Sequence, residues 1–276
     1  MHCNICDGEM SLKFRARIMS RYDIAYYLCA ACGYLCTEKP YWLAEAYSDS
    51  IPASDTGILA RNRDVAKRLA ALLYFVLGHR GQARWLDVAG GYGILTRLMR
   101  DYGFDFYWSD LYSKNVFARG FELSPGETFD GITAIEAIEH SEDPKTFVSD
   151  ALRLSSTKTF VFTTEIYSGA PPNPEEWWYY ALNTGQHVAF FQERTLRTLA
   201  EGFGLQYARS KNLHIFSQRP VPSLALSVLT GRTATLVELT LRRLLKSRVV
   251  PDHEWLARQR VPEAEPSISK KRAIDL

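Results

Sequence analysis

The run WLDVAGGYG at residues 85–93 constrains the fold of this chain more than any other segment. It predicts a buried strand that carries one acidic residue, Asp87, and ends in a glycine-rich turn. Gly90, Gly91 and Gly93 can adopt positive φ angles or lie against a ligand, because they have no Cβ. Apolar residues follow at helical spacing, so the turn opens a helix whose free N–H groups face the same crevice. This combination predicts a site for a nucleotide-type cofactor.

A glycine turn alone does not say which cofactor is bound, because dinucleotide-binding folds and methyltransferase folds both use one. A G-x-G-x-x-G fingerprint would need a small residue where this chain has Thr96. Asp87 lies inside the strand, where dehydrogenases usually keep apolar residues. A carboxylate there can hold the N–H groups of the loop or the ammonium group of an amino-acid-bearing cofactor. S-adenosylmethionine is a cofactor of that kind.

Three further segments extend the pattern along the chain. The run FYWSD predicts a second strand that ends in Asp110, about the right distance beyond the glycine turn to bind ribose hydroxyls. The run FDGITAIEAIEH at 129–140 predicts a strand that enters a polar loop, and HVAFF at 187–191 precedes a predicted helix. With LDVAGGYG at 86–93, these motifs resemble those of the class I S-adenosylmethionine-dependent methyltransferases. The resemblance covers roughly residues 82–218.

The resemblance implies an α/β, Rossmann-like fold with a seven-stranded sheet in the order 3-2-1-4-5-7-6 and strand 7 antiparallel. It also implies a set of cofactor-binding residues: Asp87, Ala89, Gly90, Gly91, Gly93, Asp110, Leu111 and Glu136. Arg61 is a further candidate, for the cofactor carboxylate or a substrate phosphate. The chain departs from the family between Asp110 and the expected strand at 118–123, where the usual helix is cut short. No obvious acidic residue directly follows that strand to receive the adenine amino group.

Four of the five cysteines form two C-x-x-C pairs, Cys3 with Cys6 and Cys29 with Cys32. Paired C-x-x-C motifs predict a structural zinc site, here in a small ribbon with strands near 13–19 and 25–28. Four thiolates leave no open coordination position, so we expect a structural role. Disulfides are the alternative, which a chain without a signal peptide disfavours. A cysteine-rich unit ahead of the catalytic fold also resembles certain sugar-modifying methyltransferases, notably the deoxysugar C-methyltransferases.

The predicted organisation has four parts. Residues 1–38 form the zinc ribbon, 39–81 a helical linker or lid, 82–218 the methyltransferase domain, and 219–276 a helical extension and tail. Within the extension, residues 236–246 form an apolar and basic amphipathic helix. We expect it to dock on its own domain or on another subunit, with contact to an anionic membrane surface as the alternative.

Composition sets limits on the function. The chain has 276 residues, 46% of them hydrophobic, enough for one substantial core and a small additional unit. The formal net charge of +2 gives no electrostatic case for binding nucleic acid. No apolar run approaches the ~20 residues that span a bilayer, and no signal peptide is apparent. We therefore expect a cytoplasmic protein without a transmembrane segment, and a homodimer stays open.

Methyl transfer to oxygen needs a base, and histidine is suited to that task. His140 follows the fourth predicted strand, at the sheet edge where ligands bind, and His187 lies in a loop that closes over the acceptor in related folds. Glu139 and Glu136 are candidates to orient a histidine or the substrate. The alternative is that both histidines only bond to backbone groups. The aromatic run WWYY at 177–180 either stacks on a sugar ring or packs a lid against the core.

The sequence favours transfer of a methyl group from S-adenosylmethionine to a small molecule or glycan, preferably to a sugar hydroxyl in polysaccharide or secondary-metabolite assembly. A sugar carbon acceptor is the nearest variant. A nicotinamide-dependent oxidoreductase is a second hypothesis, but it lacks the complete glycine fingerprint. A non-catalytic, zinc-bearing scaffold is a third hypothesis.

Overall fold

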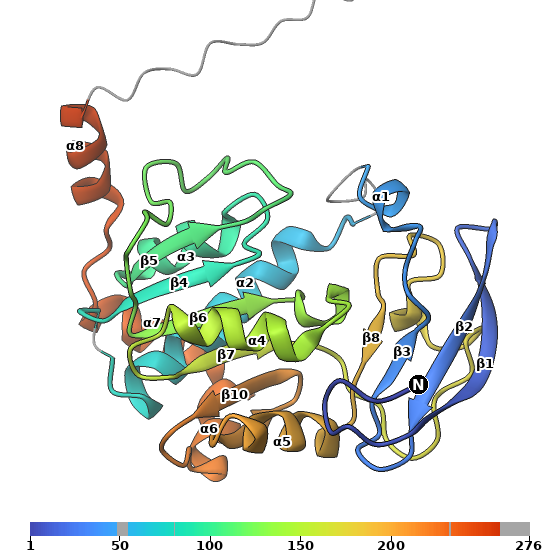
Figure 1. The fold of residues 1–276 in the computed structure, drawn as a ribbon. Coiled ribbons are helices and arrows are strands. Elements are labelled where there is room, and N and C mark those ends of the chain that lie inside the picture. Colours follow the sequence, from blue (N-terminus) through green and yellow to red (C-terminus); the bar gives the residue numbers. More distant parts are fainter. Residues whose placement is uncertain (49–54, 80, 232, 260–276) are drawn as a thin grey trace, which may run out of the picture.

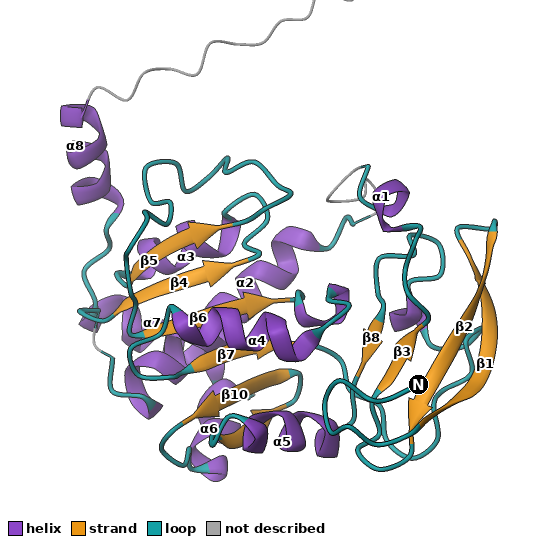
Figure 2. Cartoon of the chain, viewed as in Figure 1, coloured by secondary structure: helices purple, strands orange, loops and turns teal. Residues whose placement is uncertain are grey.

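The computed structural model describes residues 1–48, 55–79, 81–231 and 233–259. A six-stranded mixed sheet lies at its centre, in the order β5-β4-β6-β7-β10-β9 (Figures 1 and 2). The first four strands run parallel, and β10 is antiparallel to both β7 and β9. The bounds are Arg84–Val88 for β4, Asp105–Ser109 for β5, Gly131–Ile135 for β6, Phe160–Thr163 for β7, Gln206–Ser210 for β9 and Leu213–Ser217 for β10.

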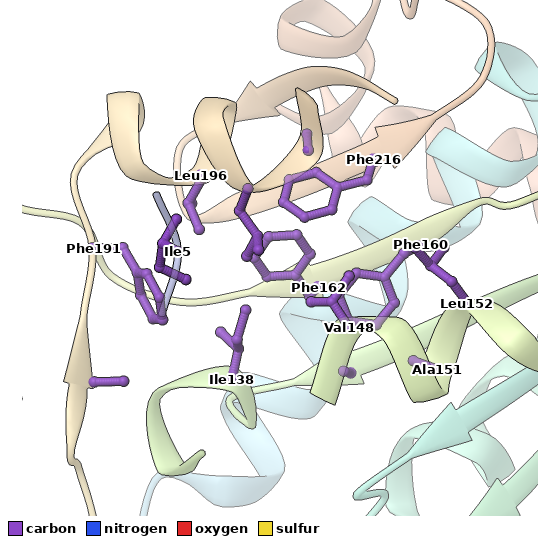
Figure 3. Packing of buried hydrophobic residues seen from close by; sticks show 14 of the residues in the cluster. Ile5, Ile138, Val148, Ala151, Leu152, Phe160, Phe162, Phe191, Leu196 and Phe216 are labelled. Atoms are coloured by element: carbon purple, nitrogen blue, oxygen red, sulfur yellow. The ribbon is translucent and has the colours of Figure 1, made fainter. Parts of the chain in front are cut away.

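Helices cover both faces of this sheet, which is why β7 is buried along its whole length. On one face lie α2 (Ile58–Ala71, continued by a π-turn at Leu72–Val76) and α3 (Ile94–Tyr102), whose Leu69 and Met99 are fully buried beside Phe106. The other face packs against α4 (Pro144–Arg153) and α5 (Glu193–Gly202). Figure 3 shows their apolar side chains around Phe160 and Phe162. The helix expected after the glycine turn is confirmed as α3, and the one expected after HVAFF is confirmed as α5.

The predicted order 3-2-1-4-5-7-6 is wrong in its first member, because the described residues form no strand at 118–123. The remaining six strands follow the expected order. The segment does lie beside β5, but it makes only one bridge, between Trp108 and Glu122. Local side chains take the N–H groups that a strand would use: Asn115 accepts from Ala118, and Glu122 accepts from Gly120. Gly120, with φ of +88°, also turns the chain there.

The N-terminal residues form a separate antiparallel sheet in the order β1-β2-β3-β8. Its strands are Met10–Ile18 (β1), Tyr22–Cys29 (β2), Leu35–Thr37 (β3) and Ala189–Phe190 (β8). The last strand comes from the long segment between β7 and α5, so the N-terminal sheet is completed by a segment that leaves the central sheet. The two parts also share a core, in which Ile5 packs beside Phe191 and Leu196 (Figure 3).

Three helices follow β10: α6 (Ser223–Thr230), α7 (Ala234–Leu244) and α8 (Val249–Gln259). Leu226 of α6 and Leu241 of α7 are fully buried in the cluster around α2, whereas Leu236 and Leu239 are exposed. Asp252 of α8 accepts hydrogen bonds from the Arg100 guanidinium at 2.7 and 2.8 Å. The predicted tail at 262–276 lies outside the described residues.

Within the part of the chain that the structure describes, no single helix has the length and apolar character needed to cross a membrane. Ser223–Thr230 and Thr235–Leu244 meet that test only as a pair, bent by 90°.

Candidate active site

The glycine turn leaves the carboxyl end of β4 and opens α3, as expected. Gly91 and Gly93 have φ angles of 53° and 82°, and Ala89 shares this left-handed conformation with φ of 53°. A Cβ on Gly90 would lie 2.8 Å from Cδ1 of Trp108, and one on Gly93 would lie 2.8 Å from Oδ1 of Asn115. The turn is therefore packed so closely that side chains at these two positions would displace its neighbours.

Asp110, at the end of β5, joins the next loop to the glycine turn. Its Oδ2 accepts a hydrogen bond from the Gly91 N–H at 2.9 Å, and its Oδ1 accepts from the N–H groups of Tyr112 and Ser113 at 2.7 Å each. An ionised carboxylate has about four acceptor positions, so one remains for a hydroxyl of a ligand. Leu111, which follows, is 90% exposed.

Asp87 lies beneath the turn and is 1% exposed. Its Oδ1 accepts a hydrogen bond from the Thr133 hydroxyl at 2.7 Å, and its Oδ2 lies 2.9 Å from where a Gly90 Cβ would stand. Burial raises the pKa of Asp87 to about 7, while the bond from Thr133 opposes the shift. Asp87 therefore supports the turn from below and places a titratable carboxyl group against it.

These residues fit S-adenosylmethionine, because the turn has the close backbone approach and the carboxylates that a nucleoside with an amino-acid tail requires. Glu136, after β6, has φ of 51° and accepts a hydrogen bond from the Thr163 hydroxyl at 2.6 Å. Arg61 lies on α2, where Asp55 binds its guanidinium through two hydrogen bonds of 2.7 and 3.0 Å. The charges of Glu136 and Glu139 also help to raise the pKa of Arg61.

The structure brings His140 and His187 together at the same edge of the sheet. His140 ends the short helix Ile138–His140 after β6, and His187 precedes β8. Their ring centroids lie 4.7 Å apart, edge to face. Burial lowers the pKa of His140 to about 4 and that of His187 to about 3, so both rings are neutral at neutral pH.

Backbone carbonyls orient both rings. The Nδ1–H of His187 donates to the carbonyl of Tyr179 at 2.7 Å, which leaves Nε2 with the lone pair. The Nδ1 of His140 lies 3.1 Å from the carbonyl of Gln186 and 2.8 Å from the hydroxyl of Tyr47, and the Glu136 carbonyl also helps to raise its pKa. One nitrogen of each ring therefore contacts a backbone carbonyl, as the predicted alternative stated. At His187 this bond fixes the proton on Nδ1, so Nε2 can accept a hydrogen bond or a proton.

Glu139 is fully buried, and neither of its carboxylate oxygens has a hydrogen-bond partner among the described residues. Burial raises its pKa well above the usual range, and the charge of Glu136 adds to this effect. The hydroxyls of Tyr179 and Thr164 oppose the shift of pKa, but they bond to each other at 2.9 Å. One ligand atom each from Glu139, His140 and His187 lie within 4.8 Å of one another.

The aromatic run at 177–180 divides between the two predicted roles. Tyr179 and Tyr180 are fully buried, and Trp177 packs on Tyr180 and Phe190, so these three rings fill the core. Trp178 alone is 73% exposed, and it lies edge to face on Tyr179.

Tyr112 lies at this site, although no sequence pattern predicted a role for it. Its ring is 74% exposed and stacks on Tyr47 with centroids 5.4 Å apart. Tyr47 in turn contacts His140. The only available signal was the place of Tyr112 two residues after the strand-end Asp110.

The four predicted zinc ligands form a compact cluster, in which all four sulfurs lie within 4.8 Å of one another. The Sγ atoms of Cys3 and Cys32 are 3.7 Å apart, and those of Cys6 and Cys29 are 3.5 Å apart. A disulfide would need about 2.05 Å. A tetrahedral ion with bonds of about 2.3 Å holds its sulfurs about 3.8 Å apart. The cluster therefore has the geometry of a metal site, and Cys36 is buried outside it.

Comparisons with known proteins bear on this site. A family model described as a methyltransferase domain matches residues 60–210. The chain is similar to the magnesium protoporphyrin IX methyltransferase of Synechocystis PCC 6803, with 15% identity over 63% of this chain and 90% of that chain, and a TM-score of 0.44. It is also similar to mitomycin 7-O-methyltransferase, with 14% identity over 63% of this chain and 59% of that chain, and a TM-score of 0.45. A search of curated proteins gives no match.

Proposed function

Because the family model covers more than half of its length, this chain belongs to the class I S-adenosylmethionine-dependent methyltransferases, and we propose that it methylates a sugar hydroxyl on a small molecule or glycan. The bound cofactor supplies a methyl group on a positively charged sulfur. The observation that carries the proposal is the contact of His140 with His187, whose ring centroids lie 4.7 Å apart, each beside a tyrosine that packs on an exposed aromatic ring.

A hydroxyl acceptor must lose its proton when its oxygen takes the methyl group. We assign the role of base to His187, because the Tyr179 carbonyl holds its Nδ1 proton and leaves Nε2 to accept another. His140 packs against it, and the charge that His140 would carry lowers the pKa of His187 further. The Thr164 and Tyr179 side chains close the site from the interior, where both are buried.

The preference for a sugar rests on Trp178 and Tyr112. Each is exposed, and each lies on a tyrosine that contacts one of the histidines: Tyr179 beside His187, and Tyr47 beside His140. Sugar rings pack their apolar C–H faces on aromatic side chains, and their hydroxyls then reach polar groups nearby. The N-terminal cysteine unit, with its likeness to sugar-modifying enzymes, supports the same class of acceptor.

The same proposal includes a structural zinc ion at the four cysteines, a cytoplasmic location and a role in polysaccharide or secondary-metabolite assembly. The sulfur separations of 3.5 and 3.7 Å support zinc. The low net charge supports a small-molecule or glycan partner and not a nucleic acid.

Transfer of a labelled methyl group to a panel of nucleotide sugars and glycans tests the proposal. We expect an O-methyl product, and a loss of kcat of about 10²–10⁴ in His187→Gln. His214→Gln is the matched control, because His214 is also buried and neutral but lies in β10 with both ring nitrogens bonded, to Tyr207 and Thr164. If no sugar in the panel is methylated, the proposed acceptor is wrong. Methylation at carbon would favour the alternative of a sugar C-methyltransferase.

A further inference from the structure

We propose that Glu139, His140 and His187 bind a divalent cation of the zinc type, at a second metal site separate from the four cysteines. The three residues each offer one ligand atom, and these atoms lie within 4.8 Å of one another. Two imidazoles and one carboxylate are a ligand set that zinc accepts in proteins with an open fourth position. The site itself stands on geometry, and its use in the reaction rests on the proposed function.

Glu139 supplies the observation that calls for a ligand. Its carboxyl group is fully buried, and both oxygens are without a hydrogen-bond partner among the described residues. A buried polar group normally has a partner, because an unsatisfied one keeps the full cost of its removal from water. The charge of Glu139 helps to raise the pKa of Arg61, but the guanidinium of Arg61 donates its hydrogen bonds to Asp55. A cation between Glu139 and the histidines would satisfy both oxygens and replace a missing partner.

The histidines have the environment of metal ligands. A histidine that binds a metal through one nitrogen almost always donates the other N–H to a carbonyl, carboxylate or water. The Tyr179 carbonyl accepts from His187, and the Gln186 carbonyl lies 3.1 Å from Nδ1 of His140.

The backbone holds the two ligand-bearing segments together. The N–H of Val188, next to His187, donates to the carbonyl of Glu139 at 2.9 Å, so the segments are joined at the site itself. Gln186, the residue before His187, also contacts the ring of His140 through its carbonyl. His140 and His187 are both only partly buried, so one side of the cluster remains open to a ligand.

The two metal sites would differ in chemistry. The cysteine cluster has four protein ligands and is closed, whereas the cluster of Glu139, His140 and His187 has three and leaves a position for an oxygen atom. A cation there would attract the hydroxyl oxygen of the proposed acceptor. His187 would then act as a ligand, and the acceptor hydroxyl, made more acidic by the cation, would pass its proton to solvent water on the open side of the site.

Titration with Co²⁺ tests the inference on the full chain whose cysteine cluster has first been loaded with Zn²⁺. We expect one further ion per chain, with the visible d–d bands of nitrogen and oxygen ligands and without thiolate charge-transfer bands. Glu139→Gln and His187→Gln should each weaken this binding about 100-fold. His214→Gln should bind Co²⁺ as the parent does. Absence of the extra ion, or full affinity in Glu139→Gln, would overturn the proposal.

Activity separates this inference from the proposed function. A chain that binds no extra cation but methylates a sugar, and fails to do so as His187→Gln, refutes the metal site and keeps the histidine as a base. A chain that binds the cation but methylates no sugar refutes the acceptor and keeps the site.

Discussion

The candidate active site has two sides, a cofactor side and a proposed acceptor side, and they are built in different ways. The cofactor side consists of the turn at 85–93 and Asp110, and most of it is one continuous strand, turn and helix start. The acceptor side consists of Tyr47, Tyr112, Glu139, His140, Trp178 and His187, which come from four distant parts of the chain. The first is organised by its own backbone. The second exists only when the rest of the molecule has folded.

The acceptor side also depends on the N-terminal sheet. The N–H of Thr37, in β3, donates to the carbonyl of Val188, and Val188 in turn donates to Glu139. Near the cysteines, the hydroxyl of Thr195 donates to the Cys32 carbonyl, and that of Tyr167 donates to the Gly33 carbonyl, each at 2.7 Å. Loss of the cysteine cluster should therefore damage the acceptor side and spare the cofactor side.

The largest expected effect comes from Cys32→Ser. Binding of structural zinc supplies about 10–16 kcal/mol in small zinc domains, so its loss should unfold the N-terminal sheet. We expect methyl transfer to fall below detection, while the Kd for S-adenosylhomocysteine, measured by calorimetry, changes less than about threefold. Cys36→Ser makes the same chemical change outside the cluster and should keep the metal. If Cys32→Ser lost cofactor affinity as well, the two sides would not be independent.

The opposite separation is expected from Gly93→Ala. Its Cβ would lie 2.8 Å from Asn115 and 3.1 Å from the Ala118 nitrogen, at φ of +82°. We expect about a 100-fold loss of affinity for S-adenosylhomocysteine, with the metal content unchanged. Gly126→Ala is the matched control, because Gly126 has the same φ of +82° but nothing within 4 Å of its Cβ. It should lose about 1 kcal/mol of stability and bind the cofactor normally.

This contrast explains what the sequence could reveal. The strand, turn and helix start of the cofactor side could be predicted because they form one continuous segment, and Asp110 lies only 19 residues beyond Gly91. On the acceptor side the sequence indicated the two histidines, two glutamates and the aromatic run at 177–180, but not Tyr112 or the contact of Tyr47 with His140, which depends on tertiary packing. The strand predicted at 118–123 is not formed for a different reason, because side-chain hydrogen bonds there compete with those of the sheet.

A smaller effect is expected from Trp178→Ala, which tests the acceptor side alone. Because Trp178 is exposed, its removal should cost little stability, but it should raise KM for the sugar about tenfold by removing a stacking face. Trp177→Ala removes a neighbouring ring that packs on Tyr180 and Phe190, so it should lower the melting temperature instead. Equal KM values for the parent and Trp178→Ala would contradict stacking of the acceptor on this ring.

The smallest effect is a pH dependence that distinguishes the two sides. Asp87 has a pKa of about 7, against about 3.9 in an unfolded chain. Between these values the folded protein without cofactor binds more protons, so its free energy of unfolding should decrease as the pH rises from about 4 to about 7. Asp87→Asn should remove that contribution.

Binding of the cofactor should show the opposite sign, because its ammonium group favours the ionised form of Asp87. We expect affinity for S-adenosylhomocysteine to increase about threefold from about pH 6.5 to about pH 7.5 in the parent chain and to stay constant in Asp87→Asn. The histidines have pKa values of about 3 and about 4, so they do not change charge in this interval. The rate of turnover at saturating cofactor should therefore show no histidine titration between these pH values. If it shows an inflection near pH 6.5 that His187→Gln removes, the acceptor side is more open to water than its burial indicates.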